Sequence, residues 1–234
     1  MRRYSFRLVL LAILAIGSTS EIYAHDYWIE GKGNDFVLVY GHGSNRMDID
    51  PSKVKGIRAL NVAGTEIAVD KEIKGKVLAL RAKERPSLLL VEVDNGYWSK
   101  TVHGWKNLPR RKAEKVVESY RSLFYAKSIL IWSDTAQRQL TEGLDISPLN
   151  DPLVMKSGDV LPLKVTYNGK PLTSATLEGQ SHEILATTNT EGVAVVKLSK
   201  GGMVIAVDHK GRLNNDPDAD YLSITATLSF EVPR

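Results

Sequence analysis

Short runs rich in β-branched and aromatic residues, each followed by Gly, Asn, Asp or Pro, are the feature that most limits the fold of this chain. Such side chains favour extended strands, and the turn-forming residues between them interrupt the chain too often for long helices. In the first half, these runs occupy residues 36–40, 58–62, 77–82 and 88–93. Their number and spacing predict an antiparallel β-sandwich rather than alternating βαβ units.

The second half shows the same pattern in a simpler form. Apolar and polar residues alternate, as in strands with one buried face, over residues 160–167, 173–177, 183–188, 193–198, 202–209 and 223–232. Turn dipeptides separate several of these runs at Asn168-Gly169, Glu191-Gly192 and Gly201-Gly202. This half is therefore expected to form a compact second β-sandwich of transthyretin or immunoglobulin type.

The two strand-rich halves meet where Gly143, Pro148, Asn150 and Pro152 accumulate. Gly and Pro interrupt regular structure, so this stretch is expected to separate two domains. We place a β-rich domain over residues 25–146 and the second β-sandwich over residues 147–234.

Residues 108–125 are the exception to the β pattern. Pro109 stands at an expected helix start, and Val116, Val117, Tyr120 and Phe124 recur at helical spacing. The spacing predicts one helix late in the first domain, followed by a strand over residues 126–133. The helix would carry a basic cluster, expected to be a solvated face, made of Arg110, Arg111, Lys112 and Lys115.

The amino terminus has the three parts of a secretory signal peptide. Arginines precede an apolar run at residues 8–16, and a polar stretch then ends in the small residue Ala24. The apolar run is much shorter than the roughly 20 residues that a permanent membrane helix needs. We therefore expect residues 1–24 to be cleaved, and the chain to reach the periplasm without remaining embedded in the membrane.

Charge and cysteine content exclude several classes of function. Residues 1–24 hold three arginines and one glutamate and so contribute +2 to the formal net charge of +4, which leaves +2 on the rest of the chain. This small charge gives no reason to expect nucleic acid as a partner. The chain has no cysteine, so disulfides and thiolate metal sites are excluded, while nitrogen and oxygen ligands remain available.

Cleavage after Ala24 would make His25 the first residue. The α-amine and the imidazole Nδ1 of an amino-terminal histidine can bind one metal ion in a six-membered ring, which no internal histidine can do. Both nitrogens lose their protons readily near neutral pH. His25 is therefore the leading candidate for a metal ligand.

Four other histidines are present. His42 stands between two glycines after an expected strand, where the backbone can come close to a bound ion. His103 lies in a segment rich in aromatic residues, and His209 ends an expected strand beside Asp208, which could orient its ring. His182 is expected to be a loop residue.

Motifs for catalysis are missing from the sequence. There is no His-Glu-x-x-His, no nucleophile elbow and no glycine-rich phosphate loop after a strand. We therefore expect a binding protein rather than an enzyme.

The segment His25-Asp26-Tyr27-Trp28-Ile29-Glu30 resembles the start of the DUF4198 family, whose members are exported bacterial proteins associated with nickel and cobalt uptake. The opening histidine followed by Asp, an aromatic residue and Trp is the most specific mark. The likeness continues through Gly41-His42-Gly43, Tyr125-Ala126-Lys127, residues 143–148, Gly158-Asp159, Gly169-Lys170-Pro171-Leu172, Thr190-Glu191-Gly192 and residues 221–232. Asp145 and Ser147 depart from the family pattern, where Glu and Val are expected.

The resemblance implies that the protein captures Ni²⁺, or Co²⁺, in the periplasm and supplies an inner-membrane uptake transporter. It transfers the role of metal ligand most directly to His25, next to His42, and more weakly to His103 and His209.

Two alternatives stay open. The same nitrogens suit Cu²⁺ and Zn²⁺, so the protein could be a periplasmic copper carrier or an oxidase with a histidine brace. It could also be a metal-free module for adhesion or interaction at the cell envelope.

Overall fold

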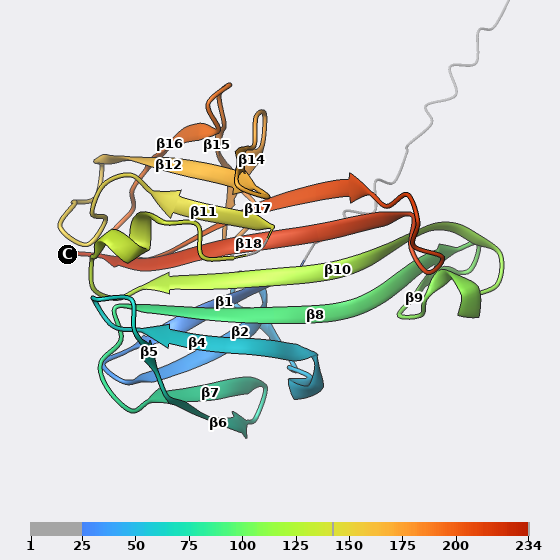
Figure 1. Cartoon of the computed structure of the whole chain (residues 1–234), viewed down its shortest axis with the longest axis horizontal. Coiled ribbons are helices and arrows are strands. Elements are labelled where there is room, and N and C mark those ends of the chain that lie inside the picture. The colour runs from blue at the N-terminus through green and yellow to red at the C-terminus, as the bar shows by residue number, and fades with distance from the viewer. Residues whose placement is uncertain (1–24, 142, 234) are drawn as a thin grey trace, which may run out of the picture.

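The computed structural model describes residues 25–141 and 143–233 and shows a mainly β protein built from three sheets (Figure 1). Residues 1–24, the predicted signal peptide, lie outside the described part. A nine-stranded central sheet lies between an N-terminal sheet of five strands and a C-terminal sheet of four. The predicted β-sandwich fold class is confirmed.

The N-terminal sheet packs on one face of the central sheet. Their shared core includes Tyr27, Phe36 and Leu38 from the N-terminal sheet, and Val91 and Phe124 from the central sheet. The strands of the N-terminal sheet are β1 (Asp26–Lys32), β2 (Asp35–His42), β3 (Asn45–Met47), β6 (Val69–Lys74) and β7 (Val77–Ala82).

The C-terminal sheet packs on the opposite face of the central sheet. Leu161, Leu163 and Val196 from this sheet meet Ile205 and Leu228 in a second core. Its strands are β11 (Leu144–Pro148), β12 (Val160–Tyr167), β13 (Lys170–Pro171) and β16 (Val193–Lys197).

The central sheet draws strands from both halves of the sequence. β10 and β18 run parallel, in register from Tyr120 opposite Tyr221 to Ser128 opposite Ser229, and this pairing joins the two halves into one sheet. The strands are β4 (Val54–Leu60), β5 (Glu66–Ile67), β8 (Leu88–Thr101), β9 (Gly104–Lys106), β10 (Val116–Ile129), β14 (Thr176–Gly179), β15 (Ile184–Thr187), β17 (Gly201–Arg212) and β18 (Tyr221–Val232). The expected division between residues 146 and 147 falls inside β11, next to this shared sheet.

The predicted helix over residues 108–125 is wrong. The segment forms a single 3₁₀ turn, Arg110–Lys112 (η2), and then enters β10. Tyr120 and Phe124 are four residues apart. That spacing is two repeats of a strand and close to one turn of a helix, about 3.6 residues, so the two side chains share a face in either structure. Val117 distinguishes the two, because in a helix it would share the buried face of Tyr120 and Phe124, whereas it is 64% exposed.

Other helical structure in the described chain is equally short. It consists of the 3₁₀ turns Pro51–Lys53 (η1) and Asp134–Gln137 (η3). Among the described residues, no helix has the length and apolar character needed to span a membrane.

A buried ion pair links the central and C-terminal sheets. The Lys127 ammonium on β10 contacts the Asp145 carboxylate on β11, and their side chains are only 3% and 1% exposed. Ser147 Oγ accepts a hydrogen bond from Lys127 Nζ at 3.2 Å, and the Leu140 N–H donates to Asp145 Oδ2 at 3.1 Å. The two residues that depart from the family pattern, Asp145 and Ser147, are thus the ones that contact Lys127.

Lys127→Met is expected to lower the free energy of unfolding by about 3–5 kcal/mol, because it leaves the Asp145 carboxylate charged and buried without its counterion. Urea unfolding measures the change. Arg81→Met is a matched control, since Arg81 and Asp35 form an ion pair whose side chains are 70% and 68% exposed, and it is expected to change stability little. Equal stability of the Lys127→Met and wild-type proteins would contradict this role of the pair.

Candidate functional site

Three histidines come together where β1 begins and β2 ends. Asp26 lies opposite Gly41 in the antiparallel β1–β2 pair, so His25, just before β1, lies beside His42 at the end of β2. The third histidine is His182, in the turn between β14 and β15. Its ring centroid lies 4.3 Å from that of His42, with the rings nearly perpendicular at 85°. We call His25, His42 and His182 the histidine cluster.

A backbone hydrogen bond holds the two contributing loops together. Gly43 N–H, in the turn after β2, donates to the Gln180 carbonyl at 3.0 Å. Gly43 has a positive φ of 53°, a conformation that glycine adopts without steric cost. The histidine cluster therefore spans the N-terminal sheet and the β14–β15 hairpin of the central sheet.

The turn that carries His182 is tight. His182 has a φ of 60°, and its N–H donates to the Gly179 carbonyl at 2.9 Å. The Glu183 carboxylate packs against Gly179, where a Cβ would lie 2.0 Å from it, so any larger residue would displace that side chain. A left-handed conformation is uncommon outside glycine and often marks functional positions.

Glu178 fixes the orientation of the His182 ring. Its Oε2 lies 2.9 Å from His182 Nδ1. A carboxylate at Nδ1 is the usual partner of a metal-binding histidine, because it selects the tautomer that presents Nε2 as a ligand.

His25 lies beside a pair of stacked tyrosines. Its ring centroid is 5.6 Å from that of Tyr40, and the Tyr40 ring stacks on Tyr27 at 4.3 Å. Burial, followed by the neighbouring His42 and His182, lowers the pKa of the His25 imidazole. The neutral imidazole is the form that binds metals.

Three carboxylates lie next to the histidine cluster. Asp26 is only 6% exposed, and burial, followed by repulsion from Asp208, raises its pKa to about 7; Glu178 also raises it, while His182 lowers it. Burial also raises the pKa of Asp208, against the hydrogen bond donated by Thr225, which lowers it. Asp208 and Glu178 both line an open recess of about 270 Å³, through which water reaches Asp208. Protein atoms surround the other sides of the Asp208 carboxylate.

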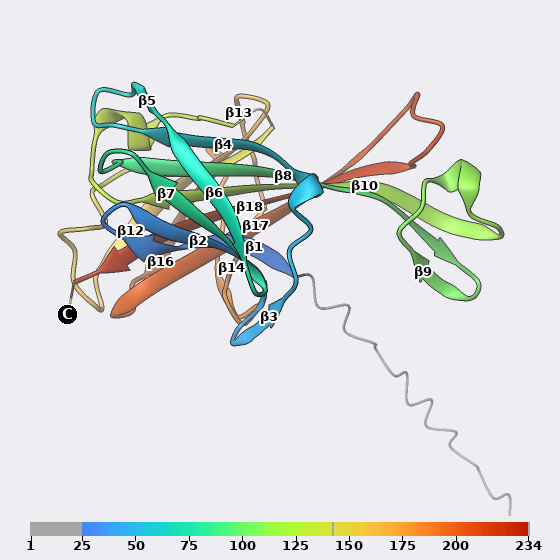
Figure 2. The ribbon, with the colours of Figure 1, turned by 90° about the horizontal axis from the view of Figure 1, so that it is seen from below.

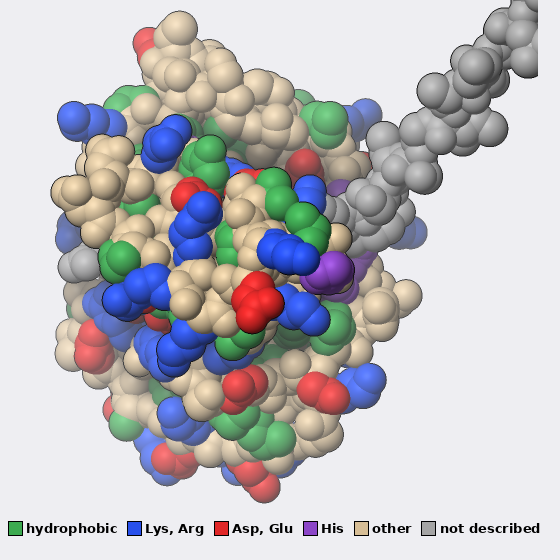
Figure 3. Space-filling model, turned by 90° about the vertical axis from the view of Figure 1, so that its right-hand side faces the viewer, with side chains coloured by type: hydrophobic (Ala, Val, Ile, Leu, Met, Phe, Trp, Pro, Cys, Tyr) green, Lys and Arg blue, Asp and Glu red, His purple; other side chains and the backbone are tan. Residues whose placement is uncertain are grey.

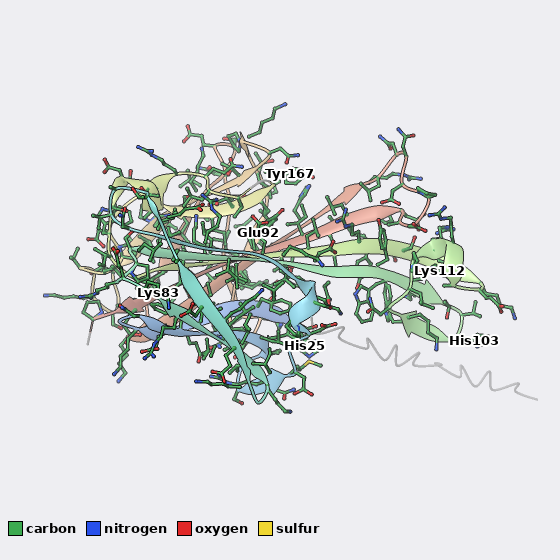
Figure 4. The ribbon with its side chains drawn as sticks, turned by 60° about the horizontal axis from the view of Figure 1, so that its bottom comes forward. His25, Lys83, Glu92, His103, Lys112 and Tyr167 are labelled. Atoms are coloured by element: carbon green, nitrogen blue, oxygen red, sulfur yellow. The ribbon has the colours of Figure 1, made fainter. Side chains whose placement is uncertain are left out.

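The structure does not bring His103 or His209 to His25. His103 is exposed in the turn between β8 and β9, at the projecting end of the molecule and far from His25 (Figure 4). His209 lies on the face of β17 opposite to Asp208, and its ring packs on Tyr167 of the C-terminal sheet, with centroids 4.2 Å apart. Of the expected ligands, only His25 and His42 are neighbours.

Sequence reasoning missed His182 because nothing local connects it with His25. The run Glu178-Gly179-Gln180-Ser181-His182-Glu183 does place acidic residues on both sides of a histidine, which was an available signal. Its proximity to His42 depends on strand pairing between distant parts of the chain.

Side chains alone do not complete a metal site. Within residues 25–141 and 143–233, no group of three or more His, Asp or Glu side chains could hold a metal ion as they lie. A metal site at the histidine cluster therefore needs a further donor. Cleavage after Ala24 would create one within the cluster itself, the α-amine of His25.

The fold and these residues define an all-β protein with a histidine cluster at the junction of two sheets. Residues 22–211 match the family described as "Domain of unknown function (DUF4198)". The chain belongs to this family.

Other comparisons add little. No curated protein matches the chain. Among solved structures, the chain is similar to the fibronectin(III)-like modules of Clostridium thermocellum CbhA, with 11% sequence identity and a TM-score of 0.26 over 91% of this chain and 92% of that chain.

Asp26→Asn is expected to stabilise the metal-free protein more at pH 8 than at pH 5. The folded-state pKa of Asp26, about 7, lies above the ordinary 3.8, so its contribution to wild-type stability falls as the pH rises from about 4 through 7, whereas asparagine has no proton to lose. Urea unfolding in EDTA at both pH values measures the gain.

The exposed Asp70 on β6 supplies the control Asp70→Asn. A gain from Asp26→Asn that is the same at pH 5 and pH 8 would contradict the raised pKa.

Proposed function

We propose that the protein is a periplasmic carrier that binds Ni²⁺, or Co²⁺, at its processed amino terminus and supplies the ion to an inner-membrane uptake transporter. One observation carries the proposal. His42 and His182, from separate sheets, converge on His25, the residue that follows the predicted signal peptide.

The donor set suits a borderline divalent ion. The α-amine and imidazole of His25 would form one chelate ring, and the imidazoles of His42 and His182 would complete a shell of four neutral nitrogens. Such a set favours Ni²⁺, Cu²⁺ and Zn²⁺. The nearby carboxylates of Asp26, Glu178 and Asp208 would balance the charge of the ion without binding it.

The metal site in this proposal differs from the four-histidine set expected from the sequence. His182 replaces His103 and His209, because the latter two lie elsewhere in the fold. The proposal remains that of a binding protein, with no catalytic step.

A single alanine placed before His25 is expected to weaken Ni²⁺ binding about tenfold or more. The extra residue converts the His25 amine into an amide, which removes one of the four nitrogens, and a tenfold loss corresponds to about 1.4 kcal/mol. Isothermal titration calorimetry compares this protein with one that begins at His25.

An alanine added at the carboxyl terminus controls for the change in length. Equal affinity of the protein beginning at His25 and the protein with the extra amino-terminal alanine would refute the terminal chelate.

Alanine substitutions at the histidines separate the ligand sets. His42→Ala and His182→Ala are each expected to weaken Ni²⁺ binding about tenfold or more, because each removes one imidazole. His103→Ala and His209→Ala are expected to leave the affinity unchanged. The reverse pattern would show that the ion binds elsewhere.

Copper is the second candidate, favoured by the all-nitrogen donor set, for which Cu²⁺ has the highest intrinsic affinity. The role would again be that of a carrier. Metal analysis of the protein from cells grown with nickel, cobalt and copper at equal concentration distinguishes the candidates.

A further inference from the structure

The central sheet extends well beyond the sheet that covers it. Four strands of the central sheet, β8, β10, β17 and β18, continue past the amino-terminal end of β1 (Figure 2). The outer ends of β8 and β10, together with β9, form a projecting end. On this outer part, no sheet formed by the described residues covers the face that elsewhere packs on the N-terminal sheet. This uncovered face begins next to the histidine cluster.

Aromatic side chains form a row across this face. Trp98 on β8 lies opposite Tyr120 on β10, and Tyr120 lies opposite Tyr221 on β18. Residues that pair directly point to the same side of a sheet. The Trp105 ring from β9 contacts Tyr120 edge-on, with centroids 5.3 Å apart. We call Trp98, Trp105, Tyr120 and Tyr221 the aromatic shelf, and all four are only partly buried.

The side of the row is established by Phe124, which follows Tyr120 on β10 by four residues. Phe124 packs against Tyr27 of the N-terminal sheet, with ring centroids 5.0 Å apart. Since alternate residues of a strand share a face, Tyr120 points to the side of the central sheet on which the N-terminal sheet packs.

Basic side chains lie over the shelf. Lys210 Nζ is 4.3 Å from the centre of the Tyr221 ring, and Lys100 Nζ is 5.8 Å from that of Trp105. Lys210 also contacts Glu118. Lys and Arg side chains are prominent on the end of the molecule shown in Figure 3. The shelf therefore combines aromatic surface with flexible positive charge.

Tyr40 connects the shelf with the histidine cluster. Its ring lies 5.6 Å from His25, and its hydroxyl is close enough to Tyr120 to contribute, after burial, to the raised pKa of Tyr120. Tyr40 therefore lies between the shelf and the histidine cluster.

We propose that the aromatic shelf binds an aromatic carboxylate chelator that brings the metal ion to the histidine cluster. The inference rests on the proposed function for its metal and on the shelf geometry for its ligand. Aromatic rings stack on an aromatic ligand, while Lys100 and Lys210 attract its carboxylates. A neutral sugar would use the rings but would gain nothing from the positive charge of the two lysines.

Two chelators with the same metal-binding atoms test the proposal. Dipicolinate and iminodiacetate each offer one nitrogen and two carboxylates, but only dipicolinate has an aromatic ring. Calorimetry with the protein that begins at His25 is expected to show about tenfold tighter binding of dipicolinate than of iminodiacetate, both without metal and as their nickel complexes.

Variants assign this preference to the shelf. Tyr221→Ala is expected to remove the preference, because it removes an aromatic ring of the shelf. Lys210→Ala is expected to weaken the binding of both chelators, because both carry the carboxylates that Lys210 attracts. Both substitutions are expected to leave the affinity for aqueous Ni²⁺ unchanged. Val195→Ser, at an exposed apolar position of β16 in the C-terminal sheet, is the control and should retain the preference. Near-ultraviolet circular dichroism checks that each variant is folded.

The outcomes separate this proposal from the proposed function. Equal binding of the two chelators, or a preference that survives Tyr221→Ala, overturns the shelf and leaves the metal site standing. Tighter binding of neutral cellohexaose than of dipicolinate also overturns it. Dipicolinate binding that requires Tyr221, in a protein that binds no nickel, supports the shelf while refuting the metal carrier.

Discussion

The parallel pairing of β18 with β10 is the interaction on which the rest of the structure depends. It places the last strand of the chain in the middle of the central sheet, with β17 and β14 beyond it. Side chains of β18 then hold the first strand, because Thr227 Oγ1 donates to the Tyr27 carbonyl at 2.7 Å and Ser229 Oγ donates to the Ile29 carbonyl at 2.9 Å. This arrangement brings the β14–β15 turn, with His182, to the start of β1.

The neighbourhood of His25 departs from ordinary folding rules. Asp26 is a buried carboxylate close to Asp208 and Glu178. Burial, followed by repulsion from Asp208, raises its pKa to about 7. His182 adopts a left-handed conformation beside them. Proteins keep such locally unfavourable features mainly at functional positions. A bound divalent cation would relieve the repulsion among the carboxylates, which supports the proposed function.

Local sequence patterns predicted where the strands lie better than they predicted which strands pair. The runs at residues 77–82 and 160–167 coincide with β7 and β12, because alternation and turn residues act over a few positions. The helix over residues 108–125 was wrong because Tyr120 and Phe124 fit both periodicities, and only pairing with β8 and β18 selects the strand. The contact between His42 and His182 could not be predicted, since it depends on strands far apart in the sequence.

The central claim is that export exposes His25 as an amino-terminal metal ligand within the histidine cluster. Mass spectrometry under non-denaturing conditions, on protein recovered from the cells that make it, reports the first residue and the bound ion together. The account predicts a chain of residues 25–234 that carries one nickel or cobalt ion. A chain that begins at any other residue, or one that begins at His25 and binds neither metal, would contradict it.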